Sequence, residues 1–471
     1  MTLVNGSDEY QSATVPPPSG APERRRLTLD LDVDVCVVGA GLAGLSAALD
    51  LARMGASVAV IESRQLGWGA SGHHLGTVMP GFGVPIDELI GRIGLDGTRE
   101  LWALSKQGAD HVRDTAGRLA SETSLIQATG ALEVSNVDIG DRLIGRLQLL
   151  SEELATDVEG WQVDRVRDTL KSRRYFHAIH YPGAFQVDAP RYLEGLATLA
   201  RQAGVRIFEE TPVLSIEASG IRKRIFTASA RVRAAHIVLA GNVHLGAPSP
   251  RLTGTLLPVW RYAALTEPLG ERLAEAVTFQ GAVMDSNGID HFRIVDGDRL
   301  LWSSPEATWP ADPRRFSGAI RRRIRAVFPA LDKIGIAGIH GGAIGQTVHG
   351  MPQIGELRPG LWVASGFGRQ GLNTTALAGQ LIARGILWGD DRWRLFAPFE
   401  LVWAGGRLGR AAGHAVGLWT RASAASGGLL ARWRERAAAR ETLREARLAA
   451  ANRQAADGLA PSPGSSGAAA D

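Results

Sequence analysis

The sequence is almost free of cysteine and poor in lysine. Its single cysteine among 471 residues is Cys36, which excludes a disulfide framework and a thiolate metal site. Cys36 lies in an apolar run and is expected to be a small buried side chain. No metal site is predicted, and because a reducing compartment suits this composition, we expect a cytoplasmic protein. The lysines are Lys106, Lys171, Lys223 and Lys333.

A large net charge and a secretory signal are also lacking. The 52 basic and 48 acidic residues give a formal charge of +4, which is too small for this length to indicate nucleic-acid binding. Residues 1–31 are polar and rich in proline, serine and glycine, and we expect a disordered lead without the apolar core of a signal peptide. With 45% hydrophobic residues, the remainder is long enough for two or more globular domains.

A strand, a glycine-rich turn and a helix are predicted directly after this lead. Residues 33–38 are apolar and rich in β-branched side chains, which indicates a buried strand, and residues 45–54 continue at helical spacing. Gly39 permits a tight turn, Gly41 lets a pyrophosphate approach the backbone, and Gly44 lets helix and strand pack closely. The free N–H groups at the start of the helix then face the phosphates.

An acidic residue after the second strand completes a dinucleotide-binding pattern. Residues 56–61 predict this strand, and Glu62 ends it, about 20 residues past the glycines. A carboxylate at this place accepts hydrogen bonds from a ribose 2′-hydroxyl and repels a 2′-phosphate. The sequence therefore predicts a dinucleotide without that phosphate.

The segment after Glu62 resembles that of a known family. GWGASGHHLGTV, residues 67–78, is similar to the cofactor loop of FAD enzymes in the D-amino-acid oxidase superfamily, above all its glycine oxidase, sarcosine oxidase and γ-glutamylputrescine oxidase branch. Small residues let this loop pass close under the flavin ring. His73 and His74 stand at the two polar positions after GASG, which is a departure from the family pattern.

A second glycine turn lies near the other end of the expected ordered chain. Residues 360–365 predict a strand, and GFGRQGLNTTALAGQLIARGI follows at 366–386. This stretch resembles the closing motif of the family, in which a glycine turn passes under the flavin and a helix starts with its amino end toward the pyrimidine carbonyl. A positive helix end there stabilises a reduced, anionic flavin. The side chains expected to cap this helix are Asn373, Thr374 and Thr375.

The resemblance assigns two further places to the cofactor. The loop Thr211-Pro212-Val213 resembles the one whose valine backbone touches the adenine, with a plain strand end as the alternative. Gly241 follows the predicted strand at 237–240, where a small residue passes near the cofactor. The complete set of positions assigned to FAD is Gly39, Ala40, Gly41, Leu42, Ala43, Gly44, Glu62, Ser63, Arg64, Gly69, Ala70, Ser71, Gly72, His73, His74, Gly76, Val213, Gly241, Gly366, Gly368, Gln370, Gly371, Leu372, Asn373 and Thr374.

The resemblance implies an α/β fold with a discontinuous Rossmann-like FAD-binding domain and a mixed-sheet substrate domain. The FAD-binding domain is expected at 32–92, 185–250 and 338–392, and the substrate domain at 93–184 and 251–337. A C-terminal helical extension at 393–456 and a disordered tail at 457–471 follow. Inside the substrate domain we expect a turn at Thr129-Gly130 before a strand at 133–137, and another turn at Pro182-Gly183.

Candidates for the chemistry come from a hairpin and from the two cofactor loops. Residues 291–294 and 300–303 predict strands joined by a turn at Asp296-Gly297-Asp298, and similar hairpins in the family cover the flavin and carry substrate-binding side chains. Arg293 is suited to bidentate pairing with a carboxylate, with a solvated strand arginine as the alternative. The catalytic candidates are His74, His291, Arg293 and Arg369.

His73 raises the possibility of covalent FAD. It lies three residues before Gly76, a place comparable to that of the histidine that tethers FAD in relatives that oxidise dimethylglycine. Such a bond would raise the flavin potential and help hydride acceptance. The alternative is that His73 and His74 only hydrogen-bond the cofactor or the substrate.

The predicted reaction is FAD-dependent oxidation of the C–N bond of a small amine or amino acid. Hydride passes from the carbon beside nitrogen to flavin N5, and the imine then hydrolyses. Some oxidases of this branch place a lysine over the flavin to activate oxygen, but no lysine falls in a predicted hairpin strand here, so oxygen and an electron carrier both remain open as acceptors.

Two other functions remain open on sequence grounds. One is a dehydrogenase or demethylase that acts on a larger partner with a non-oxygen acceptor, and the other is a non-catalytic flavin-binding assembly factor. Residues 395–419 are apolar but interrupted by arginines, so they are too polar to span a bilayer alone. They do allow peripheral contact with a membrane surface.

Overall fold

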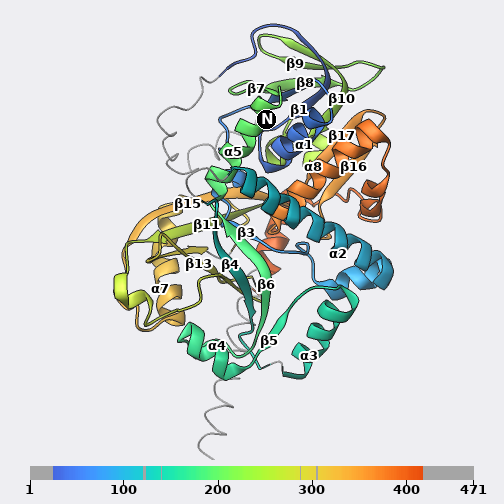
Figure 1. The fold of residues 1–471 in the computed structure, drawn as a ribbon. Helices are drawn as coiled ribbons and strands as arrows, with labels where there is room; N and C mark the ends of the chain where they lie inside the picture. Colours follow the sequence, from blue (N-terminus) through green and yellow to red (C-terminus); the bar gives the residue numbers. More distant parts are fainter. Residues whose placement is uncertain are drawn as a thin grey trace, which may run out of the picture.

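The computed structural model describes residues 25–119, 124–138, 140–286, 288–303, 306–416 and 419. Within these residues the chain forms two β-sheets, one beyond the other, with helices packed beside each (Figure 1). Most of the expected lead, most of the expected helical extension and the whole tail lie outside the described residues. The mixed α/β architecture predicted from the sequence is confirmed.

The first sheet is mostly parallel and gathers strands from three separate parts of the chain. In spatial order its strands are β16 (Gln353–Arg358), β17 (Leu361–Ser365), β10 (Arg231–Leu239), β1 (Leu31–Val38), β2 (Val58–Ile61) and β7 (Arg206–Phe208). The pairs from β17 to β7 are parallel, whereas β16 forms an antiparallel edge. The antiparallel pair β8 (Val213–Glu217) and β9 (Lys223–Thr227) continues from β10.

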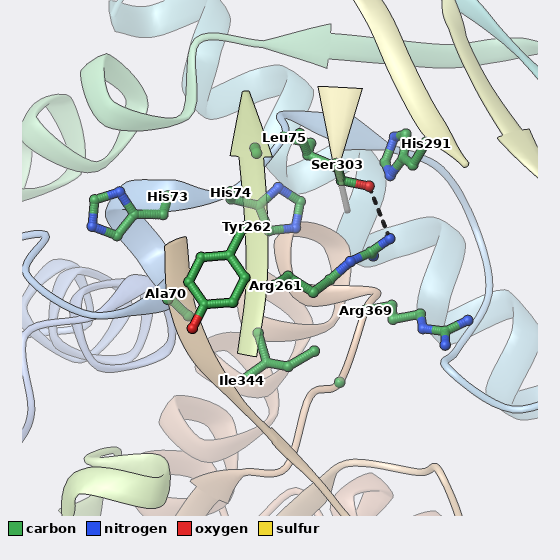
Figure 2. Close-up of a pocket in the computed structure, with 13 residues that line it drawn as sticks. Ala70, His73, His74, Leu75, Arg261, Tyr262, His291, Ser303, Ile344 and Arg369 are labelled. Atoms are coloured by element: carbon green, nitrogen blue, oxygen red, sulfur yellow. Dashed lines mark hydrogen bonds between the residues drawn. The ribbon is translucent and has the colours of Figure 1, made fainter. Parts of the chain in front are cut away.

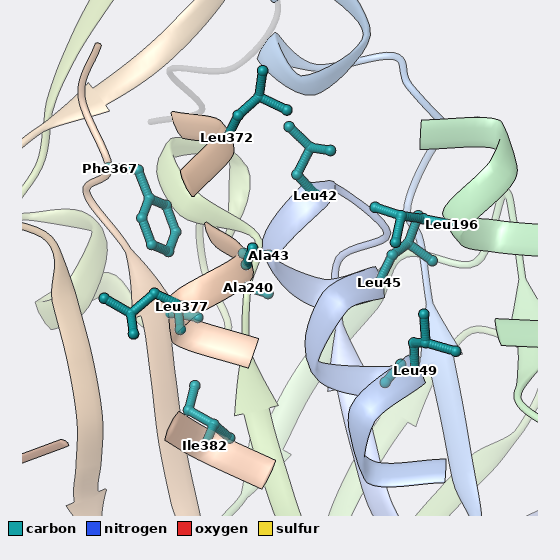
Figure 3. Close-up of a cluster of buried hydrophobic side chains, with 14 of the residues drawn as sticks. Leu42, Ala43, Leu45, Leu49, Leu196, Ala240, Phe367, Leu372, Leu377 and Ile382 are labelled. Carbon is teal, nitrogen blue, oxygen red and sulfur yellow. The ribbon is translucent and has the colours of Figure 1, made fainter. Parts of the chain in front are cut away.

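Two helices from distant parts of the sequence pack against each other beside this sheet. Helix α1 (Leu42–Arg53) follows β1, and helix α8 (Gly371–Trp388) follows β17. Their backbones nearly touch, because a Cβ atom on Gly379 would lie only 2.8 Å from the backbone nitrogen of Ala47. Buried apolar side chains of both helices, among them Leu45 and Leu377, belong to one core cluster, in which Leu45 points toward Leu196 (Figure 3).

Two further helices complete this layer. Helix α2 (Ile86–Leu119) changes direction at Gly94, whose φ is +75°. Helix α5 (Ala189–Gln202) begins as the sequence predicts, since the Asp188 carboxylate accepts a hydrogen bond of 3.1 Å from the Arg191 N–H and Pro190 lies in the first turn.

The second sheet is mixed. In spatial order its strands are β15 (Ile336–Gln346), β11 (Leu257–Thr266), β14 (Arg299–Ser303), β13 (His291–Val295), β12 (Ala282–Asp285), β4 (Ile126–Val134), β6 (Ala178–Val187) and β3 (Thr77–Val78), and β5 (Glu159–Trp161) pairs with β6. The hairpin predicted at 291–303 is confirmed as β13–β14. Strand β15 lies in this sheet although the expected FAD-binding domain resumes at residue 338; the domain boundaries stay a prediction.

A buried aromatic cluster packs against one face of the β13–β14 hairpin. Phe292 and Trp302 stack with ring centroids 4.2 Å apart, and Phe328 meets both rings edge-on. Trp302 is fully buried and fills the core. Helix α7 (Ser317–Val327) covers this cluster with Ile320 and Ile324.

Two predicted turns are wrong. Thr129 and Gly130 lie inside β4, where the pairing with β6 shifts register at a bulge and Gly130 has a φ of +82°. Pro182 and Gly183 lie inside β6, which continues from Ala178 to Val187. A glycine in a strand can mark a bulge as well as a turn, and the neighbouring strand decides which one forms.

The remaining helical segments are short. They are α3 (Gly140–Gln148), a π-helical turn (Leu149–Glu153), α4 (Val163–Leu170), α6 (Pro250–Thr253) and single turns at Asn242–His244, Gly270–Leu273, Pro313–Phe316 and Arg392–Phe396. Among the described residues, none of the helices combines the length and apolar character needed to cross a membrane.

Candidate active site

A cavity of about 340 Å³ opens at the carboxyl ends of β1, β2 and β10. Gly39, Glu62 and Ala240, each directly after one of these strands, lie in its wall. Strand ends of this kind are where parallel sheets bind ligands, and the volume lies in the range of small-molecule and cofactor sites.

The predicted roles of the first glycines agree with the geometry around them. Gly39 has a φ of +109°, and a Cβ atom there would lie 2.8 Å from the Ala240 carbonyl oxygen. A Cβ atom on Gly44 would lie 1.9 Å from the Gly39 carbonyl oxygen, so only glycine permits this helix–strand packing. Gly41 is the N-cap of α1 without a side-chain cap, which leaves the amino end of the helix beside the cavity.

Glu62 stands where the dinucleotide pattern needs its acidic residue. Its carboxylate accepts hydrogen bonds of 2.8 Å from the Ala40 N–H and 2.9 Å from the Arg64 N–H. These contacts tie the end of β2 to the glycine turn and hold the carboxylate in the wall of the cavity. Val213 and Gly241, which the resemblance also assigned to the cofactor, line the same cavity.

The loop at residues 67–76 connects this cavity to a second, smaller one. Ala70 lines both cavities, and the loop approaches the second sheet so closely that a Cβ atom on Gly342 would lie 2.9 Å from the Cα of Ala70. At the end of the loop, Gly76 has a φ of +89°, and a Cβ atom there would lie 2.1 Å from the Val187 carbonyl oxygen. A side chain at Gly342 or at Gly76 would therefore collide with the backbone that lies opposite it.

The smaller cavity has a volume of about 50 Å³. Figure 2 shows the side chains around it, which come from the cofactor loop, from β11, β13, β14 and β15, and from the turn before α8. Its polar and aromatic lining residues are His73, His74, Arg261, Tyr262, His291, Ser303 and Arg369.

The second glycine turn reaches this smaller cavity. Gly368 lines it, and a Cβ atom on Gly371, the first residue of α8, would lie 3.4 Å from Nε2 of His74. Leu42, the first residue of α1, donates a hydrogen bond of 3.1 Å from its N–H to Ser71 Oγ. The first turns of both helices therefore meet the same loop.

The capping side chains predicted for α8 have other partners. Asn373 donates to the Gly81 carbonyl oxygen, and the Thr374 and Thr375 hydroxyls donate to the carbonyl oxygens of Gln370 and Leu372. Gln370 is the N-cap and makes no side-chain cap. The predicted capping is wrong, and the amino end of α8 keeps N–H groups that a ligand can bind.

His74 is a neutral ring with an assigned tautomer. Its Nδ1 accepts a hydrogen bond of 3.0 Å from the Gly76 N–H, so the proton lies on Nε2, on the side of Gly371. Burial, together with repulsion from Arg261 and Arg293, lowers the pKa of His74 to about 4.

The other two histidines of the cavity are also neutral. His291 Nε2 lies 2.9 Å from Thr77 Oγ1, and burial together with repulsion from Arg261 lowers its pKa well below the ordinary value. His73 stacks on His340 with ring centroids 5.3 Å apart, and burial lowers its pKa to about 4. The cavity therefore offers neutral imidazoles near pH 7.

Arg293, a catalytic candidate from the sequence, lies behind the cofactor loop. Its guanidinium donates hydrogen bonds of 2.6 Å to the Leu75 carbonyl oxygen and 2.5 Å to Gln127 Oε1. The side chain is buried, so the alternative of a solvated strand arginine is wrong. Arg293 is also not among the residues that line the smaller cavity. The hydrogen bond from Arg293 to the Leu75 carbonyl oxygen holds the cofactor loop in place.

Arg261 on β11 was missed by sequence reasoning. Its Nη2 donates a hydrogen bond of 3.1 Å to Ser303 Oγ, and its buried Nε has no hydrogen-bond partner among the described residues (Figure 2). Burial lowers the pKa of Arg261 to about 10, so the side chain remains a cation near pH 7. An arginine inside the otherwise apolar stretch LLPVWRYAAL was the available signal.

Arg369 and Glu306 form an ion pair at the edge of the smaller cavity. Arg369 donates from Nε to Glu306 Oε1. Burial raises the pKa of Glu306, but attraction to Arg369 and Arg261 outweighs it and leaves that pKa below its usual value.

The linings of the two cavities carry the groups that bind an extended dinucleotide. The larger cavity offers a helix amino end for phosphate and a carboxylate for ribose, and the smaller one begins at the second helix amino end. The sequence from residue 34 to residue 384 matches a family described as FAD dependent oxidoreductase.

The chain belongs to this family.

Named relatives and solved structures agree with this assignment. The oxidoreductase is 28% identical over 382 residues to the probable oxidoreductase OrdL of Haemophilus influenzae, with 80% of this chain and 88% of the relative covered. It is 28% identical to γ-glutamylputrescine oxidoreductase of Escherichia coli, with 83% and 92% covered. The glycine oxidase structure from Geobacillus kaustophilus superposes with a TM-score of 0.65 at 22% identity, over 79% of this chain and 99% of that one.

These findings confirm the resemblance inferred from the two glycine motifs. The predicted FAD dependence, the oxidoreductase activity and the fold with a Rossmann-like FAD domain are also confirmed.

We predict that His74 makes the protein less stable in acid. The pKa of His74 is about 4 in the folded protein and 6.5 for the free side chain, so unfolding takes up a proton below pH 6.5. The free energy of unfolding should fall by about 1.4 kcal/mol per pH unit from pH 6.5 toward pH 4 through this residue. Urea midpoints of His74→Gln should depend less steeply on pH across this range, whereas the exposed control His414→Gln should match the parent. Equal slopes in all three proteins would contradict the prediction.

Proposed function

We propose that the oxidoreductase oxidises the C–N bond of a small amino acid whose carboxylate binds Arg261. The observation that supports this most strongly is the buried Nε of Arg261, which has no hydrogen-bond partner within the described part of the chain and belongs to a residue that lines the smaller cavity. A buried guanidinium N–H without an acceptor is costly. A planar substrate carboxylate supplies the acceptor in the geometry that arginine favours.

The charges around the smaller cavity favour an amino acid over a plain amine. Arg261 and Arg369 are cations, Glu306 offsets one of them, and the histidines are neutral. The balance is one positive charge, which attracts a carboxylate and repels a second ammonium group. Among relatives, one is named glycine oxidase and another γ-glutamylputrescine oxidoreductase, which supports amines or amino acids as the substrate class.

The residues of the chain would position the reactants around the cofactor. Glu62 and the amino end of α1 would hold the ribose and the phosphates of FAD, and the amino end of α8 would face the ring. When bound, FAD accepts the hydride from the carbon beside the substrate nitrogen. Arg261 would fix that carbon by its carboxylate, and His74 would offer its Nε2 proton as a hydrogen-bond donor. The acceptor stays open between oxygen and a carrier.

The first test is the variant Arg261→Met. We expect KM for glycine or sarcosine to rise ~100-fold, because a charge-assisted anchor of the substrate is lost. The variant should not raise KM for methylamine, which carries no carboxylate. Steady-state kinetics of the FAD-loaded protein measure both, with Arg321→Met on the exposed face of α7 as the control. An unchanged KM for the carboxylated substrates would refute the anchor.

We also propose that His73 tethers FAD covalently. A ring nitrogen of His73 would bond to a methyl carbon of the flavin in place of a C–H bond, with the proton passing to water and the two electrons to the flavin, from which the electron acceptor of the enzyme would remove them. The ring of His73 lines the smaller cavity, and its low pKa leaves a free nitrogen lone pair near pH 7. Acid precipitation of the holoprotein should leave the yellow colour in the pellet, and His73→Ala should release it into the supernatant. His340→Ala, which removes the stacked neighbour, should keep the colour in the pellet. Colour that leaves the parent protein entirely would show that FAD is bound without a bond to His73.

A peripheral contact with an anionic membrane is proposed for the segment after α8. Trp403, Leu408 and Trp419 are 69%, 79% and 75% exposed, and residues 406–416 are helical. Residues 404–457 contain ten arginines and four acidic residues, so this stretch alone carries +6 while the whole chain carries +4. The described part of this stretch presents Arg407 and Arg410 beside the exposed apolar side chains, which favours an apolar and negatively charged occupant such as an anionic bilayer surface. A second copy would bring like charges together.

Vesicle sedimentation tests this contact. The full-length FAD-loaded protein should bind vesicles of phosphatidylglycerol and phosphatidylcholine, and not phosphatidylcholine alone. Leu408→Glu should weaken binding about tenfold, whereas Ile221→Glu at another exposed apolar position should not. Retention of full binding by Leu408→Glu, or a dimer that this variant dissociates without lipid, would contradict the proposal.

A further inference from the structure

Glu306 lies between the two arginines of the smaller cavity. The backbone next to it is fixed, because Ala307 and Trp260 exchange hydrogen bonds of 2.7 and 2.9 Å between their N–H and carbonyl groups. This pairing places Glu306 beside Arg261 on β11. Its side chain is only 17% exposed, and its carboxylate bonds Arg369 and is attracted by Arg261.

Arg369 reaches this carboxylate across Gly288. A Cβ atom on Gly288 would lie 1.9 Å from Nη1 of Arg369, so the guanidinium rests against the glycine backbone. A second acid that attracts Arg369, Asp285, has other hydrogen-bond partners: it accepts from the Asn136 amide at 3.1 Å and from the Ile289 N–H at 2.6 Å. Among the described residues, Glu306 is therefore the carboxylate that bonds Arg369.

This arrangement leaves one of two cavity arginines for a ligand. Arg261 has an unpartnered Nε, whereas Arg369 is already paired with an internal carboxylate. A substrate with one carboxylate needs only Arg261. A second carboxylate would have to separate Arg369 from Glu306 and would then lie beside a buried like charge, which is unfavourable.

We propose that Glu306 selects substrates with a single carboxylate by occupying Arg369. This inference rests on the proposed function, in which Arg261 binds the first carboxylate. Glu306 is a specificity-determining residue that acts through Arg369, and its removal would turn Arg369 into a second carboxylate site. A variant with a neutral isostere at Glu306 should therefore bind dicarboxylates more tightly than the parent does, whereas general damage to the site would weaken the binding of every ligand.

The test compares Glu306→Gln with the parent, using propionate and succinate as ligands. These anions share a skeleton and differ by one carboxylate. Binding to the FAD-loaded protein is measured by titration of the flavin absorbance. In the parent, propionate should bind at least about tenfold more tightly than succinate. In Glu306→Gln, succinate should bind about tenfold more tightly than in the parent, and propionate should change by less than about threefold.

Two further variants separate selectivity from structural damage. Glu306→Asp keeps the charge and should keep the preference for propionate. Glu306→Gln combined with Arg369→Met should lose the gain in succinate binding, because the new partner is absent. If Glu306→Gln weakens or strengthens both ligands equally, Glu306 does not select. Failure of the proposed function would look different: Arg261→Met would bind propionate as well as the parent does.

Discussion

The close approach of α1 and α8 is the constraint on which the site depends. Gly379 lets the two backbones come within a distance that a Cβ atom would forbid, so the first turns of both helices reach one loop. Because helix amino ends attract anions and electron-rich groups, this contact decides where a dinucleotide can lie. Residues more than three hundred positions apart in the sequence thus border the same pair of adjoining cavities.

The smaller cavity shows how burial and charge jointly set its chemistry. Burial keeps the three histidines neutral, and the same burial leaves the arginines charged because their pKa values begin far above neutrality. The site thus separates two tasks between residue types. Arginine supplies fixed positive charge, and histidine supplies directional hydrogen bonds without charge.

The parts of the site that repeat a backbone pattern could be predicted from the sequence, whereas the parts set by pairing between strands could not. Gly39, Gly44 and Glu62 perform local roles that follow from the order of strand, turn and helix. His291 and Arg293 are two residues apart on β13 and therefore point to the same face of the sheet. Their positions in the sequence do not reveal that the cofactor loop covers Arg293 whereas His291 lines the cavity. Glu306 carries no local signal, because its role depends on an arginine 63 positions away.

The hydrogen bond from the Gly76 N–H to His74 Nδ1 limits the proton transfers in which His74 can take part. It fixes the ring as a donor toward α8, so His74 does not serve there as a proton acceptor. The pKa is about 4 for His73 and His74 and is held well below its ordinary value by burial for His291, so these imidazoles are also too weak as bases for an aliphatic ammonium ion, whose pKa is about 10. On the proposed function, the substrate nitrogen would therefore lose its proton to bulk water, and the enzyme would use the scarce uncharged fraction of the amine, which grows as the medium becomes more alkaline.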